Sequence, residues 1–377
     1  MKKKIGINGI DLRKCKLTVA ALICIFALIS VSAAVCEKGL WIASIEKNGD
    51  SAIFADHDDS QDNGGWIQLT GGKEIQLPQP LSFTYSGTNC VEKEGIVFKI
   101  NKDKDEELKY TYPYSTHPFY TEKQTVKMDY NGPVAFKKQA VNIYLVKGLD
   151  VSSMEKALVD AKCKSLNEIL KGVDYTKTCA TLDKCGDLSK PLTFNSLEPG
   201  SYGIVITLAG DKEENVTKVL SATCFEVVDY ELKTTVANNI KEGDNLDVQM
   251  SLKNAPAGEF TYGALLINEE AYKAEMKVDS NGTIDGTNVS VNDVDLRTLG
   301  ISSVNKSELA NGFQTLIGEG NGTISIGEKN QNTLSLTAFD LTPGNYLLFT
   351  GAYEPGKGLV GIDQQKLKIS ADGTSPI

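Results

Sequence analysis

The sequence predicts a mainly β protein, in which tandem β-sandwich modules with short helical insertions follow a β-rich N-terminal domain. Three observations support this fold class. Short apolar or alternating runs recur between turn-forming residues along most of the chain. The 377 residues include 34 glycines, and β-branched and aromatic residues are frequent. Two distant stretches, Leu192 to Tyr202 and Leu336 to Tyr346, also repeat one turn motif.

In both stretches a Pro-Gly pair stands directly before a strand that opens with Ser-Tyr202 or Asn-Tyr346. Proline presets φ for the second turn position and glycine accepts the positive φ of the third, so a strand can reverse there. In immunoglobulin-like sandwiches a tyrosine at such a corner ties the chain down through its hydroxyl. Aligned without gaps from Leu192/Leu336 to Leu208/Ala352, the two segments share six of seventeen residues. We therefore expect two copies of one module.

Residues 1–34 have the features of an export signal. A basic start precedes an apolar run from Leu17 to Val31, and Ser32-Ala33-Ala34 supplies the small residues that signal peptidase accepts. An uncleaved membrane anchor is the alternative, because the stretch Leu17 to Val35 is just long enough to span a bilayer core. A lipid anchor on Cys36 is disfavoured, because Val35 is larger than the residue usual before such a cysteine.

The mature chain is strongly acidic. Removing residues 1–34 takes away six basic residues and one acidic residue, which leaves 33 Lys and Arg against 48 Asp and Glu, a net charge of −15. Such a surface repels phosphate backbones, so nucleic acid is excluded as a partner. Contact with a membrane is expected only through the N-terminal segment, if it is uncleaved.

Three regions are expected after the signal. Residues 36–128 form the β-rich N-terminal domain. Residues 129–230 form the first module, with a helix over 152–171 that a Ser152/Glu155 capping box opens. Residues 231–370 form the second module, whose polar insertion separates a strand at Tyr262–Ile267 from the corner. Residues 371–377 are a polar tail.

Six cysteines remain in the mature chain, and an even number in an exported protein indicates disulfides. Six cysteines allow fifteen pairings. By domain we expect Cys36 to pair with Cys90 and the other four to pair among themselves. Zinc is the minor alternative, because no His lies near Cys179 and Cys185. The six are Cys36, Cys90, Cys163, Cys179, Cys185 and Cys224.

Asn-x-Ser/Thr sequons are candidate glycan acceptors in an exported protein. Four of the five fall in the polar insertion of the second module, where glycans would shield one face. Any single sequon is equally consistent with a polar turn. The five acceptors are Asn215, Asn281, Asn288, Asn305 and Asn321.

Two further ligand sites are considered. No cofactor is expected except possible calcium, because Asp56, Asp58, Ser60 and Asp62 place oxygens at alternate positions that can wrap this ion. The acidic run lacks the glycine and the final glutamate of the helix-flanked calcium loop, so a solvated acidic turn is the alternative. Trp66, Tyr112 and Tyr114 can form an aromatic platform for sugar or peptide, with core packing as the alternative.

The sequence contains no recognisable reaction centre. It has only two histidines, His57 and His117, and lacks a nucleophile elbow, a phosphate-binding glycine loop and a dinucleotide fingerprint. Paired carboxylates for glycoside cleavage are the one enzymatic arrangement that the sequence leaves open. We therefore expect no enzymatic activity and no catalytic residue.

Together the signal, the acidic β-rich modules, the Pro-Gly-Tyr corners and the sequons resemble exported cell-surface proteins of methanogenic archaea, which carry a β-rich domain of uncharacterised function. The resemblance implies an extracellular location and no catalytic residues. We therefore expect a structural or adhesive surface protein whose partners are envelope components or other surface proteins. A sugar- or peptide-binding module and a carbohydrate-active hydrolase are the alternatives.

Overall fold

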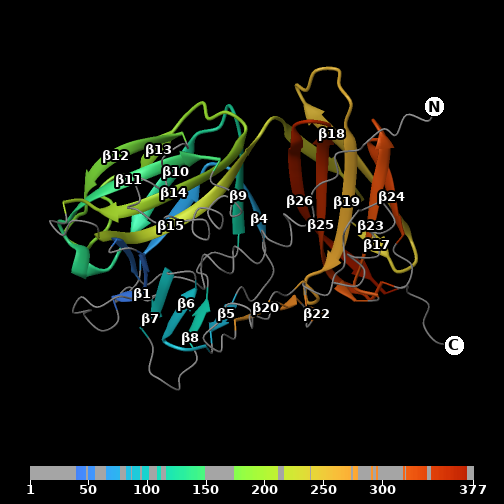
Figure 1. The fold of residues 1–377 in the computed structure, drawn as a ribbon. Helices are drawn as coiled ribbons and strands as arrows, with labels where there is room; N and C mark the ends of the chain where they lie inside the picture. Colours follow the sequence, from blue (N-terminus) through green and yellow to red (C-terminus); the bar gives the residue numbers. More distant parts are fainter. Residues whose placement is uncertain are drawn as a thin grey trace, which may run out of the picture. The chain divides into compact units, whose positions relative to one another are not determined.

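The computed structural model describes residues 40–47, 50–55, 65–76, 82–85, 87–93, 96–101, 108–111, 116–148, 174–210, 216–237, 239–272, 275–278, 290–291, 294–295, 317–318, 320–337 and 341–371. These residues form strands in several sheets, which confirms the predicted mainly β class (Figure 1). The helix expected over 152–171 lies outside the described residues. Within them, no helix has the length and apolarity to cross a bilayer.

The chain divides into two compact units. One unit runs as far as Asp229 and takes in residues 275–278, and the other begins at Tyr230. This division, after Asp229, lies one residue before the boundary expected after residue 230. Each unit contains one eight-stranded β-sandwich, which we call module 1 and module 2.

Module 1 consists of a three-stranded sheet, ordered β13-β10-β3, and a second sheet in which β12, β11, β14, β15 and β9 are neighbours. Its strands are β3 (Trp66–Thr70), β9 (Thr116–Thr121), β10 (Val126–Asn131), β11 (Ala140–Lys147), β12 (Tyr175–Thr181), β13 (Leu192–Phe194), β14 (Gly200–Leu208) and β15 (Val216–Val228).

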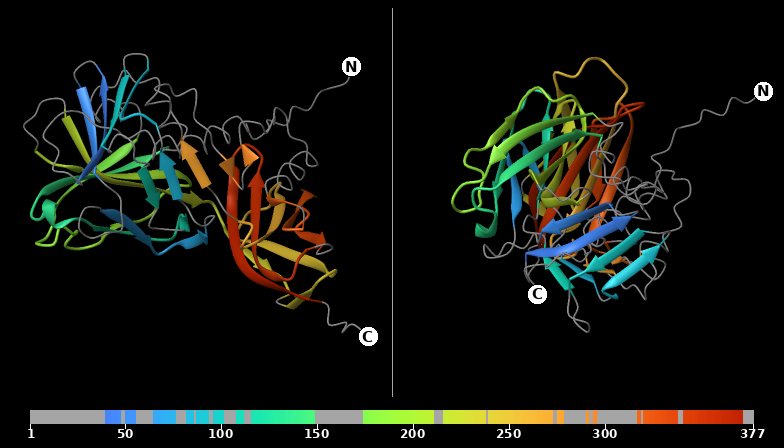
Figure 2. Two further views of the ribbon diagram at one scale, coloured as in Figure 1. Left: turned by 90° about the horizontal axis from the view of Figure 1, so that it is seen from below. Right: turned by 60° about the vertical axis from the view of Figure 1, so that its left-hand side comes forward.

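Module 2 has a three-stranded sheet, β16-β18-β24, and a five-stranded sheet, β17-β26-β25-β19-β23. Strands β25 and β26, in red, lie side by side in both views of Figure 2. The strands are β16 (Glu231–Thr235), β17 (Asn239–Lys241), β18 (Asn245–Lys253), β19 (Thr261–Asn268), β23 (Gly322–Lys329), β24 (Thr333–Thr337), β25 (Gly344–Glu354) and β26 (Gly358–Ser370).

The two modules have the same topology. Taken in chain order, each strand of module 1 has a counterpart in module 2 with the same neighbours, including one parallel pair: β9 with β15, and β17 with β26. All other pairs within the two modules are antiparallel. If the segment between the first two strands of each module is set aside, the longest segment between consecutive strands also has the same position in both modules. It lies before β12 in module 1 and before β23 in module 2. This correspondence supports the duplication that the sequence predicts.

Each sandwich closes on its own core, to which both of its sheets contribute. In β18, Leu246, Val248 and Met250 are buried and alternate with exposed residues, as predicted for a half-buried strand. The largest fully buried side chains of module 1 include Tyr120, Tyr130 and Phe225.

The tyrosine hydroxyl bond predicted for both corners is confirmed, whereas the predicted positive φ is found at Gly200 and not at Gly344. The hydroxyl of Tyr202 donates to the carbonyl oxygen of Glu198 at 2.9 Å. The hydroxyl of Tyr346 donates to the carbonyl oxygen of Thr342 at 2.6 Å. Each tyrosine reaches back four residues across the Pro-Gly turn, and each is buried in the core of its module.

The described strands of residues 36–128 are divided among several sheets. Strands β5 (Ser82–Tyr85) and β8 (Leu108–Thr111) form a separate sheet with β20 (Glu275–Val278), whereas most of the others join the sheets of module 1. The expected boundary after residue 128 falls inside β10, and β3, β9 and β10 belong to module 1. The physical reason is that β3, β9 and β10 bury the side chains of Ile67, Tyr120 and Met128 in the module 1 core. Other strands of this region extend the sheet beside β15, beginning with a parallel pair between β2 and β15.

The remaining elements lie outside the two eight-strand sets. They are β1 (Trp41–Lys47), β2 (Asp50–Ala55), β4 (Lys73–Gln76), β5 (Ser82–Tyr85), β6 (Cys90–Lys93), β7 (Ile96–Ile100), β8 (Leu108–Thr111), a 3₁₀ turn (Val134–Phe136), β20 (Glu275–Val278), β21 (Ser290–Val291) and β22 (Val294–Asp295).

Candidate functional site

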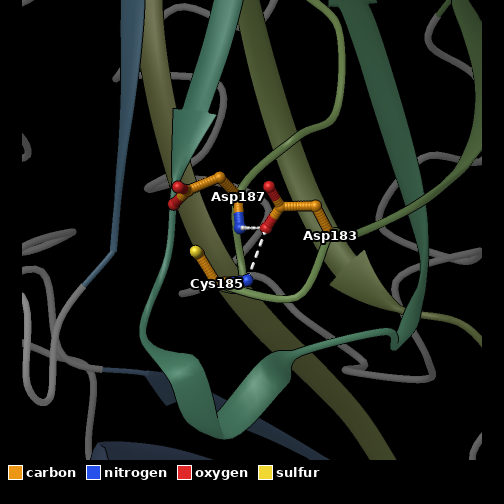
Figure 3. Close-up of side chains that lie close together, drawn as sticks. All are labelled: Asp183, Cys185 and Asp187. Carbon is orange, nitrogen blue, oxygen red and sulfur yellow. Dashed lines mark hydrogen bonds between the residues drawn. The ribbon is translucent and has the colours of Figure 1, made fainter.

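Three side chains with metal-ligating atoms gather in the loop between β12 and β13. The carboxylate oxygens of Asp183 and Asp187 and the thiol of Cys185 lie within 4.8 Å of one another (Figure 3). Cys185 is exposed and the two aspartates are half-buried. Among the described residues this is the one such cluster.

Backbone hydrogen bonds hold this loop in shape. The Oδ1 atom of Asp183 accepts the backbone N–H groups of Cys185 at 2.7 Å and Asp187 at 3.1 Å (Figure 3). The backbone N–H of Asp183 in turn donates to the carbonyl of Asp187 at 2.8 Å. These donors, with the Cys185 N–H foremost, lower the pKa of the Asp183 carboxyl group.

A glycine brings the loop against the end of β10. Gly186 has φ +97°, and a Cβ atom there would lie 2.2 Å from the carbonyl oxygen of Pro133. Only glycine allows both the positive φ and this approach. On the other side of the loop, Asp187 Oδ1 accepts the N–H of Gly132 at 3.0 Å.

The hydrogen bonds of the two aspartates close the loop. One oxygen of each aspartate is already bonded to backbone N–H groups, and these bonds join the loop to itself and to β10. Chemically, two carboxylates and a thiol suit a borderline cation such as zinc better than calcium, which takes oxygen ligands.

Sequence reasoning missed the two aspartates of this cluster. It weighed Cys185 with Cys179 and kept zinc as the minor alternative because no histidine lies nearby. The available signal was the alternation of Asp183, Cys185 and Asp187 in five consecutive residues, which places acidic groups on both sides of a cysteine.

Two of the six predicted disulfide cysteines, Cys36 and Cys163, lie outside the described residues. Cys90, Cys179 and Cys185 are exposed and are not bridged in this structure, and Cys224 is half-buried in β15. The Cys179 thiol lies 3.5 Å from Asn142 Oδ1 on the neighbouring strand.

The sheet register excludes one pairing. Cys179 on β12 and Cys224 on β15 are three strands apart, with β11 and β14 between them. The two cysteines also lie at different levels along the strands. Cys179 pairs with Asn142, which pairs with Thr207 on β14, whereas Cys224 pairs with Gly203 on β14. Strand spacing alone separates them by roughly 14 Å, beyond the reach of a disulfide.

Four of the predicted glycan acceptors, Asn215, Asn281, Asn288 and Asn305, lie outside the described residues. Asn321 is half-buried directly before β23. Its Nδ2 atom, where a glycan would be attached, donates to the carbonyl of Ile317 at 2.9 Å. The Asn321 side chain therefore makes a hydrogen bond within the protein at the start of β23.

The predicted calcium residues Asp56, Asp58, Ser60 and Asp62 and the aromatic residues Tyr112 and Tyr114 also lie outside the described residues. Trp66 opens β3, half-buried and opposite Asn131.

His117 lies on β9 opposite Ile75, with its ring edge against Phe119 at 5.1 Å between centroids. Burial lowers the pKa of His117 to about 4, so the side chain is neutral at physiological pH. His57 lies outside the described residues.

No known protein-family profile matches the chain, and no curated protein matches it. Among the solved structures that show distant similarity to the chain are the following two. Red sea bream transglutaminase has a TM-score of 0.25 and 8% identity, over 81% of this chain and 31% of its own. Escherichia coli alpha-2-macroglobulin activated by porcine elastase has a TM-score of 0.21 and 10% identity, over 91% of this chain and 35% of its own. The chain thus spans about a third of each, and scores this low transfer no function.

Proposed function

We propose that this protein is an exported, non-enzymatic surface protein whose β-sandwich modules have a structural or adhesive role. The observation that carries the proposal is the tandem duplication: two eight-strand sandwiches of one topology, each with its own core and tyrosine corner. Tandem sandwiches are a common way to build extended surface proteins.

Other features support the same role. Residues 1–34 have the sequence features of an export signal, which would deliver the modules outside the cytoplasm. The net charge of −15 after its removal favours a soluble, mutually repelling surface rather than binding to anionic polymers. The resemblance to exported archaeal surface proteins agrees with both features. The proposed partners are envelope components or other surface proteins.

Fractionation of the native organism, followed by mass spectrometry of the purified chain, tests this proposal. We expect the protein in the envelope or medium fraction, with a mature N-terminus near residue 35 or, if the segment is an anchor, with residues 1–34 retained in the membrane fraction. Recovery of the full-length chain in the cytoplasmic fraction would refute the proposal.

A matched pair of variants tests whether residues 1–34 act as the export signal. In an exporting host, Leu22→Arg places a charge inside the apolar run, so we expect the chain to stay in the cytoplasm. Lys4→Arg keeps the charge of the basic start, and its export should match that of the unchanged protein. Equal export of Leu22→Arg would show that residues 1–34 are not the export signal.

A further inference from the structure

The first segment of module 2 runs beside its last strand and in the same direction. At one end, the N–H of Tyr230 donates to the carbonyl of Val360 at 2.9 Å. At the other end, β17 pairs in parallel with the end of β26, and the N–H of Glu242 donates to the carbonyl of Ser370 at 3.0 Å. The segment Tyr230–Glu242, whose strand β16 pairs with β18 in the other sheet, is thus bonded to β26 through its backbone at both ends.

Side chains of β26 bridge the middle of this contact. Asp363 is 4% exposed, and its Oδ2 atom accepts the N–H of Thr234 at 3.0 Å. The Nε2 atom of Gln365 donates to the carbonyl of Thr234 at 2.9 Å. Both backbone groups of Thr234 are therefore held by side chains of the last strand. We call the contacts between Tyr230–Glu242 and Val360–Ser370 the strand clamp.

The direction of the strand clamp determines how it responds to tension. Because the two segments are parallel, the chain enters module 2 at one end of the clamp and leaves it at the opposite end. Tension between those two points slides the segments past each other, so all the clamp bonds carry load together. Bonds loaded from one end break in sequence, whereas bonds loaded in parallel must break nearly at once.

The core adds to this resistance. Ile240 on β17 and Ile369 on β26 face each other in the register, and both are buried. Sliding the two segments would expose these side chains to water, which opposes the motion at the same moment as the hydrogen bonds do.

We propose that module 2 is a tension-bearing element and that the strand clamp is its load-bearing part. This inference rests on the proposed surface role, because a chain held between an envelope and a partner experiences tension. It adds a specific property: resistance to unfolding that depends on the direction of pulling.

Single-molecule force spectroscopy on the full chain tests the proposal without altering the clamp. One pair of handles at Asp229 and Ala371 loads the clamp in shear. A second pair at Asp229 and Pro355, in the turn before β26, pulls from the end where Tyr230 meets Val360 and peels the clamp open. We expect a severalfold higher unfolding force for the first pair. Equal forces in the two directions would overturn the proposal.

A variant pair then assigns the resistance to the clamp. Asp363→Ala removes the bridge to Thr234, whereas Leu334→Ala creates a cavity in the same core from β24, outside the clamp. At matched loss of thermal stability, the shear force should fall more for Asp363→Ala. An equal fall would mean that general stability sets the force.

The directional comparison needs no variant of the clamp residues, so it decides the matter even if Asp363→Ala does not fold. Its result is also independent of the fractionation experiment, which reports location and not mechanics. A cytoplasmic protein with a direction-dependent force would refute the surface role alone.

Discussion

At the scale of single residues, the two tyrosine corners carry the same bond. Tyr202 and Tyr346 each donate a hydroxyl to a carbonyl four residues earlier. Since both side chains are buried, removing the hydroxyl leaves that carbonyl without this partner.

We expect Tyr202→Phe and Tyr346→Phe each to lower the free energy of unfolding of their own module by about 1 kcal/mol. Tyr353→Phe is the control, because Tyr353 lies on β25, half-buried, away from the corner turn. Thermal or urea denaturation measures the effect. A corner variant as stable as the control would contradict the structural role of the corner.

Gly186 is the residue on which the loop of the Asp183, Cys185 and Asp187 cluster depends. Gly186→Ala combines a strained φ with a Cβ 2.2 Å from the Pro133 carbonyl, so the loop must move. We expect a loss of about 1–3 kcal/mol in the stability of module 1.

Gly210→Ala is the matched control, because Gly210 has φ +82° but open space around its Cβ position. Denaturation of both variants separates backbone strain from the close approach. Equal losses would show that the contact with Pro133 has no cost.

His117 gives the protein a defined response to acid. Its pKa is about 4 in the folded state and 6.5 when exposed, so the unfolded chain binds the proton first as the pH falls. Stability is therefore lost between about pH 6.5 and pH 4, by at most about 3 kcal/mol.

His117→Phe should remove this part of the pH dependence, while His117→Lys, which stays charged, should destabilise the protein at neutral pH as well. Unfolding free energies measured from pH 7 to pH 4 give the comparison. An unchanged pH slope in His117→Phe would contradict the burial of this imidazole.

At the scale of elements, the register of the module 1 sheet restricts the disulfides. Cys179 and Cys224 lie on strands that β11 and β14 separate. Peptide mapping of the unreduced protein should therefore contain no Cys179–Cys224 linkage. Recovery of that linked peptide in native, undenatured material would contradict the strand order.

The elements also show what sequence patterns can and cannot reveal. Alternation in β18 and the Pro-Gly-Tyr corners are local features, so they predicted strands and turns correctly. Membership of β3 in module 1 depends on pairing with β10, which lies nearly sixty residues later along the chain. No local pattern around Trp66 encodes that partner, so the sequence placed β3 in the wrong group of strands.

The candidate site was less accessible to sequence reasoning than the fold. The Asp183, Cys185 and Asp187 cluster depends on a loop that Gly132 and Gly186 bring against β10, and a cysteine between two aspartates has no unique meaning in sequence. In the strand clamp, the hydrogen bond between Asp363 and Thr234 joins positions far apart in the chain. A strand pattern alone cannot identify such partners.

At the scale of the whole molecule, the account depends on duplication. The eight strands of module 2 all follow Tyr230 and pair only with one another among the described residues, and the first and last segments of the module are joined by the strand clamp. In module 1, by contrast, β15 also pairs with β2 and β9 also pairs with β4, which are strands outside the eight. Module 2 is therefore the copy that should fold without help.

Expression of residues 230–371 alone tests this central claim most directly. We predict a folded domain with one cooperative thermal transition, dispersed amide resonances, and slow hydrogen exchange in β19, β25 and β26, which lie at the centre of its larger sheet. A chain that stays unfolded by these measures, under conditions in which the full-length protein is folded, would contradict the existence of two complete copies of one module.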